Sequence, residues 1–99
     1  MRKYITEFIG TFFLVLTIGC AVVIHPTGSI APLAIGFTVM SGAFSVGSIS
    51  GAAFNPAVAV GTSLMGVSAW SNLWIYLVAN LAGGVIAAGV FKFINPEDK

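Results

Sequence analysis

The residues best placed to do chemistry in this sequence form a short polar break, Asn55-Pro56, between two apolar stretches. Asn is a favourable N-cap residue, and Pro is favourable at the first helical position because no amide hydrogen is needed there. Asn55-Pro56-Ala57 therefore predicts the start of a helix. The free backbone N–H groups and positive dipole end of that helix suit a neutral, hydrogen-bonding guest and repel cations. The Asn55 amide can add two donors.

Glu7 and Thr11 form a second polar pair, four residues apart and therefore on one face of a helix. Two interpretations of the carboxylate are open. It could lie at the membrane surface, where a helix N-terminus would stabilise it. It could instead face the interior of a helix bundle, as ionisable residues in membrane spans usually do, and we favour this second interpretation.

The composition is that of an integral membrane protein. Of the 99 residues, 58% are hydrophobic and 7% are charged, and the mean hydropathy is +1.03. All Asp, Glu, Lys and Arg residues lie at positions 2–7 or 92–99, whereas a soluble domain of this size would need far more polar surface. The net charge of +1 gives no reason to expect a nucleic-acid partner. The sequence offers no metal-binding cluster, catalytic dyad or phosphate-binding loop, so we expect neither an enzyme nor a cofactor.

Three stretches are long and apolar enough to span a bilayer, which takes about 20 residues. They cover residues 4–24, 30–47 and 72–93. The first would be about 31 Å long at the helical rise, and we interpret it as a retained span, not a cleaved signal peptide. A loop at 25–29 follows it, and a polar tail at 94–99 ends the chain. Aromatic residues that should anchor the third span in the headgroup layer stand at its start: Trp70, Trp74 and Tyr76.

The stretch from 48 to 66 contains an apolar piece that is too short to span. From Asn55 to Leu64 it would measure about 15 Å as a helix, which is roughly half of the hydrocarbon thickness. Irregular backbone at membrane depth persists only where protein shields it or where it lines a water-filled cavity. The expected fold is therefore an all-α membrane protein with three transmembrane helices and one re-entrant half-helix. The half-helix should enter from the face where the second span ends.

These stretches resemble the aquaporin, or major intrinsic protein, family of water and small-solute channels. The similarity lies in TEFIGTFFLVLTIG (6–19), LAIGFTV (33–39) and SGAAFNPAV (50–58), and in ANLAGG of the third span. The family fold consists of two inverted repeats, each with three spans and one half-helix, whose Asn-Pro-Ala ends meet in mid-membrane. Residues 1–99 match a single repeat, as expected for a half-channel, a truncation or a fusion product.

The resemblance implies roles for residues around the half-helix. Backbone carbonyls of the segment before it would line the path as acceptors: Gly51, Ala52, Ala53 and Phe54. Glu7, together with Thr11, would hold this re-entrant loop by accepting its hydrogen bonds.

Ile35 and Val58 match constriction positions of the family's pore. Water-selective members carry an arginine where Val58 stands, and often a histidine where Ala53 stands. The filter implied here is apolar and wider, which argues against strict water selectivity. A hydrophobic constriction can also close by dewetting.

A single half-helix leaves backbone amides unsatisfied at membrane depth, where each is costly. A second copy, inserted the opposite way up, would repair this. With the N-terminus cytoplasmic, two of the Lys and Arg residues lie inside and two outside, so the positive-inside rule sets no orientation. We therefore expect an antiparallel homodimer in a lipid bilayer, with the bacterial inner membrane as host, that passes water or small neutral solutes such as glycerol.

Two other interpretations stay open. One is a small dual-topology transporter, which would want an ionisable residue near mid-membrane. The other is a non-conducting, truncated membrane fragment.

Overall fold

The computed structural model describes residues 1–24 and 30–96, and within them it contains helices and turns but no strand. The helices are α1 (Arg2–Ile18), continued by the π-helix η1 (Gly19–Ile24), then α2 (Ala31–Ser50), α3 (Pro56–Leu64), the short 3-10 helix η3 (Trp70–Asn72) and α4 (Leu73–Ile94). The expected all-α fold class is confirmed. The predicted loop at 25–29 and the end of the predicted tail, 97–99, lie outside the described residues.

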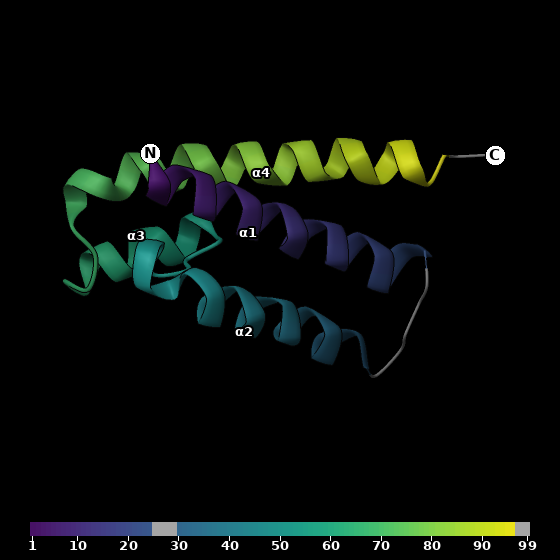
Figure 1. Cartoon of the computed structure of the whole chain (residues 1–99), viewed down its shortest axis with the longest axis horizontal. Coiled ribbons are helices and arrows are strands. Elements are labelled where there is room, and N and C mark those ends of the chain that lie inside the picture. The colour runs from purple at the N-terminus through teal and green to yellow at the C-terminus, as the bar shows by residue number, and fades with distance from the viewer. Residues whose placement is uncertain (25–29, 97–99) are drawn as a thin grey trace.

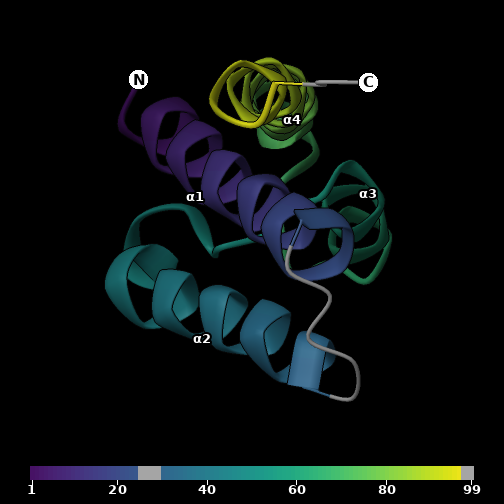
Figure 2. The same ribbon diagram turned by 90° about the vertical axis from the view of Figure 1, so that its right-hand side faces the viewer.

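Three helical stretches are long and apolar enough to cross a bilayer: Arg2–Val23, Ala31–Ser50 and Trp70–Ile94. α3, with nine residues, is too short to do so. α2 ends and α4 begins at the same end of the bundle, so the segment that carries α3 enters and leaves on one side (Figure 1). α1 lies between α2 and α4, and α3 packs beside α4 (Figure 2).

α2 extends three residues beyond its predicted end at Gly47, to Ser50. It ends there because Gly51 adopts the left-handed conformation, with φ of 85°, which glycine reaches without steric cost. The Gly51 N–H then donates to the Gly47 carbonyl oxygen at 2.8 Å, as in many helix ends. The irregular segment before α3 is therefore shorter than the sequence suggested.

A stripe of small residues on α4 lets α1 approach closely. Ala79, Gly83 and Ala87 stand four residues apart and are all buried, as expected for membrane helices that pack through small side chains. A Cβ atom on Gly83 would lie 2.6 Å from the Phe8 carbonyl oxygen. Because that oxygen belongs to the backbone of α1, it cannot move aside without shifting the helix.

We expect Gly83→Ala to destabilise the protein by about 1–3 kcal/mol, the usual effect of overpacking. Gly89→Ala is the matched control on the same helix, since a Cβ there meets no atom within 4 Å. Thermal unfolding of the two variants in detergent, followed by circular dichroism, should show a lowered midpoint for Gly83→Ala alone. Equal midpoints would mean that α1 and α4 are not in tight contact here.

The prediction that Tyr76 anchors the third span at the headgroups is wrong. Trp70 and Trp74 are exposed, at 57% and 62%, as interfacial side chains should be. Tyr76 is only 4% exposed, and its hydroxyl donates to the Ser50 carbonyl oxygen at 2.7 Å. The last carbonyls of a helix have no partner within the helix, so this contact satisfies the end of α2 and draws the tyrosine into the bundle.

Candidate functional site

The half-helix α3 begins at Asn55-Pro56. Asn55 has extended backbone (φ −162°, ψ 125°), and its Oδ1 accepts a hydrogen bond from the Ala57 N–H at 2.8 Å. Pro56 occupies the first turn, where a missing N–H costs nothing. Capping uses only the side-chain oxygen. The exposed Asn55 amide therefore keeps both Nδ2 donors, which make no hydrogen bond to any described residue.

The four residues before Asn55 form an irregular segment with unusual backbone. Gly51, Ala52 and Phe54 have φ of 85°, 55° and 53°. Non-glycine residues adopt such values rarely, at a cost of roughly 1–2 kcal/mol each. The segment therefore needs external contacts to hold its shape.

Glu7 supplies these contacts from α1. Its Oε2 accepts the Ala53 N–H at 3.0 Å and the Ser50 hydroxyl at 2.6 Å, and its Oε1 accepts the Phe54 N–H at 2.8 Å. The side chain is completely buried. Glu7 therefore faces the interior of the helix bundle, as the favoured interpretation expected.

All four N–H groups of residues 51–54 have partners. Gly51 donates to Gly47, Ala52 donates to the Ser50 hydroxyl at 3.1 Å, and the remaining two donate to Glu7. The four carbonyl oxygens of the same segment accept no hydrogen bond from the described residues. The segment thus presents acceptors without competing donors, which is the arrangement expected of a carbonyl-lined path.

Thr11 makes no hydrogen bond to this segment, although it was expected to help hold it. Its hydroxyl donates to the Asn80 Oδ1 of α4 at 2.8 Å, and both side chains are buried. Thr11 therefore joins α1 to α4. Its effect on the loop is indirect, through the position of Glu7 on the same helix.

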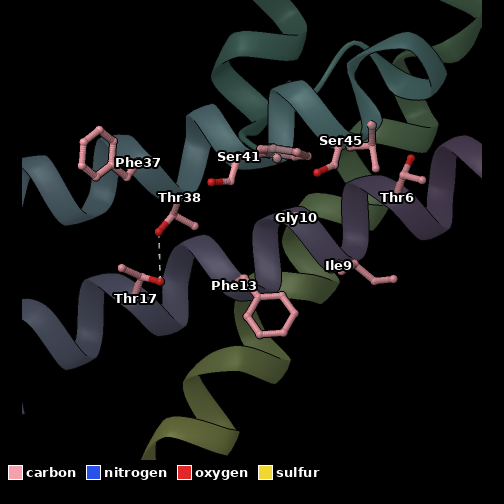
Figure 3. Close-up of a pocket in the computed structure, with 12 residues that line it drawn as sticks. Thr6, Ile9, Gly10, Phe13, Thr17, Phe37, Thr38, Ser41 and Ser45 are labelled. Carbon is pink, nitrogen blue, oxygen red and sulfur yellow. Dashed lines mark hydrogen bonds between the residues drawn. The ribbon is translucent and has the colours of Figure 1, made fainter.

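The ring of Phe54 is buried between α1 and α2. A Cβ atom on Gly10 would come within 2.1 Å of this ring, and one on Gly42 within 2.4 Å. Both glycines line a groove of about 500 Å³ between the two helices, which Phe54 also lines (Figure 3). A hydrogen bond of 3.3 Å from the Thr38 hydroxyl to the Thr17 hydroxyl joins the helices farther along this groove.

The two expected constriction residues are not brought together. Val58 is 45% exposed and lines a cavity of about 300 Å³ with Gly51 and Ala53. Ile35 lies in the second turn of α2 and is not among the residues that line this cavity. Of the two expected constriction residues, only Val58 lines the cavity beside residues 51–54.

Several residues of the site were not identified from the sequence. Ser50 and Tyr76 fix the end of α2, Asn80 binds Thr11, and Gly42 makes room for Phe54. Asn80 was the most visible of them, because an amide within a span usually bonds to another helix. The roles of the other three residues depend on how the loop folds, which no local sequence pattern indicates.

Three helices of membrane length, with a short helix between the second and the third, define a class of all-α membrane protein, and sequence comparison identifies its family. Residues 1–91 match the family model described as major intrinsic protein, and the chain belongs to that family. It is 35% identical over 100 residues to Aquaporin NIP1-2 of Arabidopsis thaliana, covering all of this chain and 34% of that protein. It is 40% identical over 101 residues to Aquaporin TIP1-1 of the same plant, covering 96% of this chain and 39% of that protein.

A third relative is Aquaporin TIP1-2 of Zea mays, 40% identical over 98 residues, with 95% of this chain and 38% of the relative covered. The chain thus spans somewhat more than a third of the length of the curated relatives it matches. Together with the three membrane-long helices, family membership establishes an integral membrane protein.

Proposed function

We propose that the chain is a subunit of a passive channel for water or small uncharged solutes such as glycerol, and not an enzyme. The carbonyl segment, residues 51–54, carries this proposal: its four backbone oxygens accept no hydrogen bond from the described residues, while each of its N–H groups donates to a partner. Free carbonyls can replace the hydration shell of a passing molecule. The Nδ2 donors of Asn55 offer a complementary contact where the helix begins.

The side chains beside this path favour neutral solutes over ions. Val58, Ala53 and Gly51 line the adjoining cavity without charge, and Lys3, the one charged residue of its lining, is a cation that repels other cations. The positive end of α3 disfavours cations. We propose that Ile35 and Val58 give the complete channel an apolar constriction, wider than one that holds an arginine, so that it admits molecules larger than water.

A counterpart for α3 is also proposed. Asn55 and Ala57 are exposed, and the carbonyls of residues 51–54 accept no hydrogen bond within the described chain, whereas unpaired backbone groups are costly in lipid. A second copy inserted the opposite way up would place its own half-helix opposite α3. The balanced Lys and Arg residues at the two ends permit both orientations.

Labelling single cysteines at each terminus from outside sealed vesicles, in a Cys20→Ser background, tests the antiparallel pair. We expect both termini to be partly accessible. One fixed orientation in all copies would exclude this pairing. The host membrane is part of the same proposal: a bacterial inner membrane is our expectation, although the relatives named above come from plants.

Asn55→Asp separates capping from solute contact. Aspartate is also a good N-cap, so the bond from the Ala57 N–H should persist, but the two amide donors are lost and a negative charge is added. We expect glycerol permeability to fall at least about tenfold, as for the loss of roughly 1.4 kcal/mol of favourable interaction, with no change in the thermal midpoint. Stopped-flow light scattering on proteoliposomes, first with sucrose and then with glycerol, measures this.

Asn55→Ala is the companion variant, since it removes the cap as well and should lower the thermal midpoint. Unchanged glycerol flux in Asn55→Asp would remove the asparagine from the path. Absence of swelling with either solute in well-folded native protein would favour the non-conducting fragment.

A further inference from the structure

A basic pocket lies at the end of the bundle where α1 begins. The end of α2 and the start of α4 lie at the same end of the bundle (Figure 1). The pocket has a volume of about 630 Å³, within the range of small-molecule sites. Its lining residues are Met1, Arg2, Lys3, Ser48, Ile49, Asn72 and Ile75.

No acidic side chain among the described residues neutralises the positive charges of Arg2 and Lys3 in this pocket. Glu7 is the only acidic residue among 1–24 and 30–96. It is completely buried, and both of its oxygens accept hydrogen bonds from the carbonyl segment or Ser50. Within these described residues, Arg2 and Lys3 therefore have no free carboxylate to bind.

Further donors line the same pocket. The side chains of Ser48 and Asn72 make no hydrogen bond to described residues, and both face a space that the two cations share. A guanidinium, an ammonium, an amide and a hydroxyl together provide the donors that a phosphate group accepts. No acceptor-rich acidic side chain among the described residues lines this space to oppose an anion.

The position of the pocket indicates where such a phosphate would come from. Exposed Trp70 and Trp74 flank Asn72 in the sequence, and exposed tryptophans gather at the headgroup level of a bilayer. Ile49 and Ile75 add apolar lining that suits the glycerol and upper acyl region of a lipid. Basic pockets between membrane helices commonly bind anionic headgroups.

We propose that this pocket binds the phosphate headgroup of an anionic phospholipid such as phosphatidylglycerol. The proposal does not rest on conduction, and Lys3, Ser48, Ile49 and Asn72 line both this pocket and the cavity beside residues 51–54. The alternative role for Arg2 and Lys3 is to complement the negative end of α2, which would give no preference between lipid headgroups.

Tryptophan quenching tests the proposal directly, because both tryptophans of the chain lie at this end. The full chain is reconstituted into phosphatidylcholine vesicles that contain brominated phosphatidylglycerol or brominated phosphatidylcholine, and the relative association constant is measured. Each cation near an anionic surface raises binding about fivefold. We therefore expect phosphatidylglycerol to be preferred by about five- to 25-fold.

Three variants test which residues produce the preference for phosphatidylglycerol. Arg2→Gln combined with Lys3→Gln should reduce it to about one, and Asn72→Leu should lower it with both charges intact. Lys92→Gln, which removes a cation from the last turn of α4 at the other end, should leave it unchanged. Gel filtration and circular dichroism check that each variant is folded.

Four results would overturn the proposal. These are equal quenching by the two lipids, a preference that survives the double substitution, a preference unaffected by Asn72→Leu, and a preference lost in Lys92→Gln. A further experiment repeats the quenching measurement with added inorganic phosphate, using chloride at the same ionic strength as the control. Full reversal by phosphate would assign the pocket to free anions and not to lipid.

Discussion

Replacing Glu7 by alanine should eliminate most of the folded, monodisperse protein. The substitution leaves three donors without a partner in a buried site: the Ser50 hydroxyl and the N–H groups of Ala53 and Phe54. Each unsatisfied buried donor costs about 1–3 kcal/mol. Even the lower figure gives roughly 3 kcal/mol in total, a large part of the 5–15 kcal/mol that stabilises a typical folded protein.

Two companion variants show whether the hydrogen bonds are responsible. Glu7→Gln keeps the size of the side chain and one acceptor oxygen but places an NH₂ group against a donor, so its yield should be intermediate. Ile9→Ala alters a half-exposed residue two positions away on the same helix and should behave as native. The readout is the monodisperse fraction in gel filtration and the midpoint of thermal aggregation. A stable, monodisperse Glu7→Ala protein would contradict the role of Glu7 in holding the loop.

Gly10 and Phe54 should show strong, non-additive coupling. A methyl group on Gly10 would overlap the buried ring of Phe54, which Gly42 confines on another side. Gly10→Ala should therefore cost about 1–3 kcal/mol through overpacking. Phe54→Ala should cost about 3–5 kcal/mol, because it leaves a cavity.

In the double variant, the space vacated by the ring accommodates the new methyl group. Its loss of stability should therefore be at least about 0.5 kcal/mol smaller than the sum of the single losses, the coupling expected of residues in contact. Gly36→Ala paired with Phe54→Ala is the control, since a Cβ on Gly36 meets nothing within 4 Å, and that pair should be additive. Additive losses for Gly10 and Phe54 would show that the ring does not occupy the gap between α1 and α2.

Much of the fold could be predicted from hydropathy and length. Three apolar stretches of bilayer length and one of half that length determine the number of spans, and the structure has three such helices with α3 between the second and the third. The start of α3 was also predictable, because an asparagine followed by proline satisfies local rules for a helix N-terminus. These features depend only on neighbours in the sequence.

The contacts that hold the site depend on how the chain folds in three dimensions, and they were harder to predict from the sequence. Tyr76 resembles an interfacial aromatic residue in sequence, but the free carbonyl at Ser50 draws it inwards. Thr11 shares a helix face with Glu7 but bonds to Asn80 on a different neighbour. The roles of Ile35 and Val58 in a constriction remain predictions, because a complete pore would need a second half.

The carboxylate that holds the loop precedes its three partners by 43, 46 and 47 residues in the chain. Proteins are synthesised from the N-terminus, so α1 enters the bilayer before the loop exists. An irregular loop is not stable in hydrocarbon alone. Here the Glu7 carboxylate that accepts its hydrogen bonds is already in the membrane when the loop is synthesised. A circular permutation that moved α1 to the end of the chain would reverse this order and expose the loop amides during insertion.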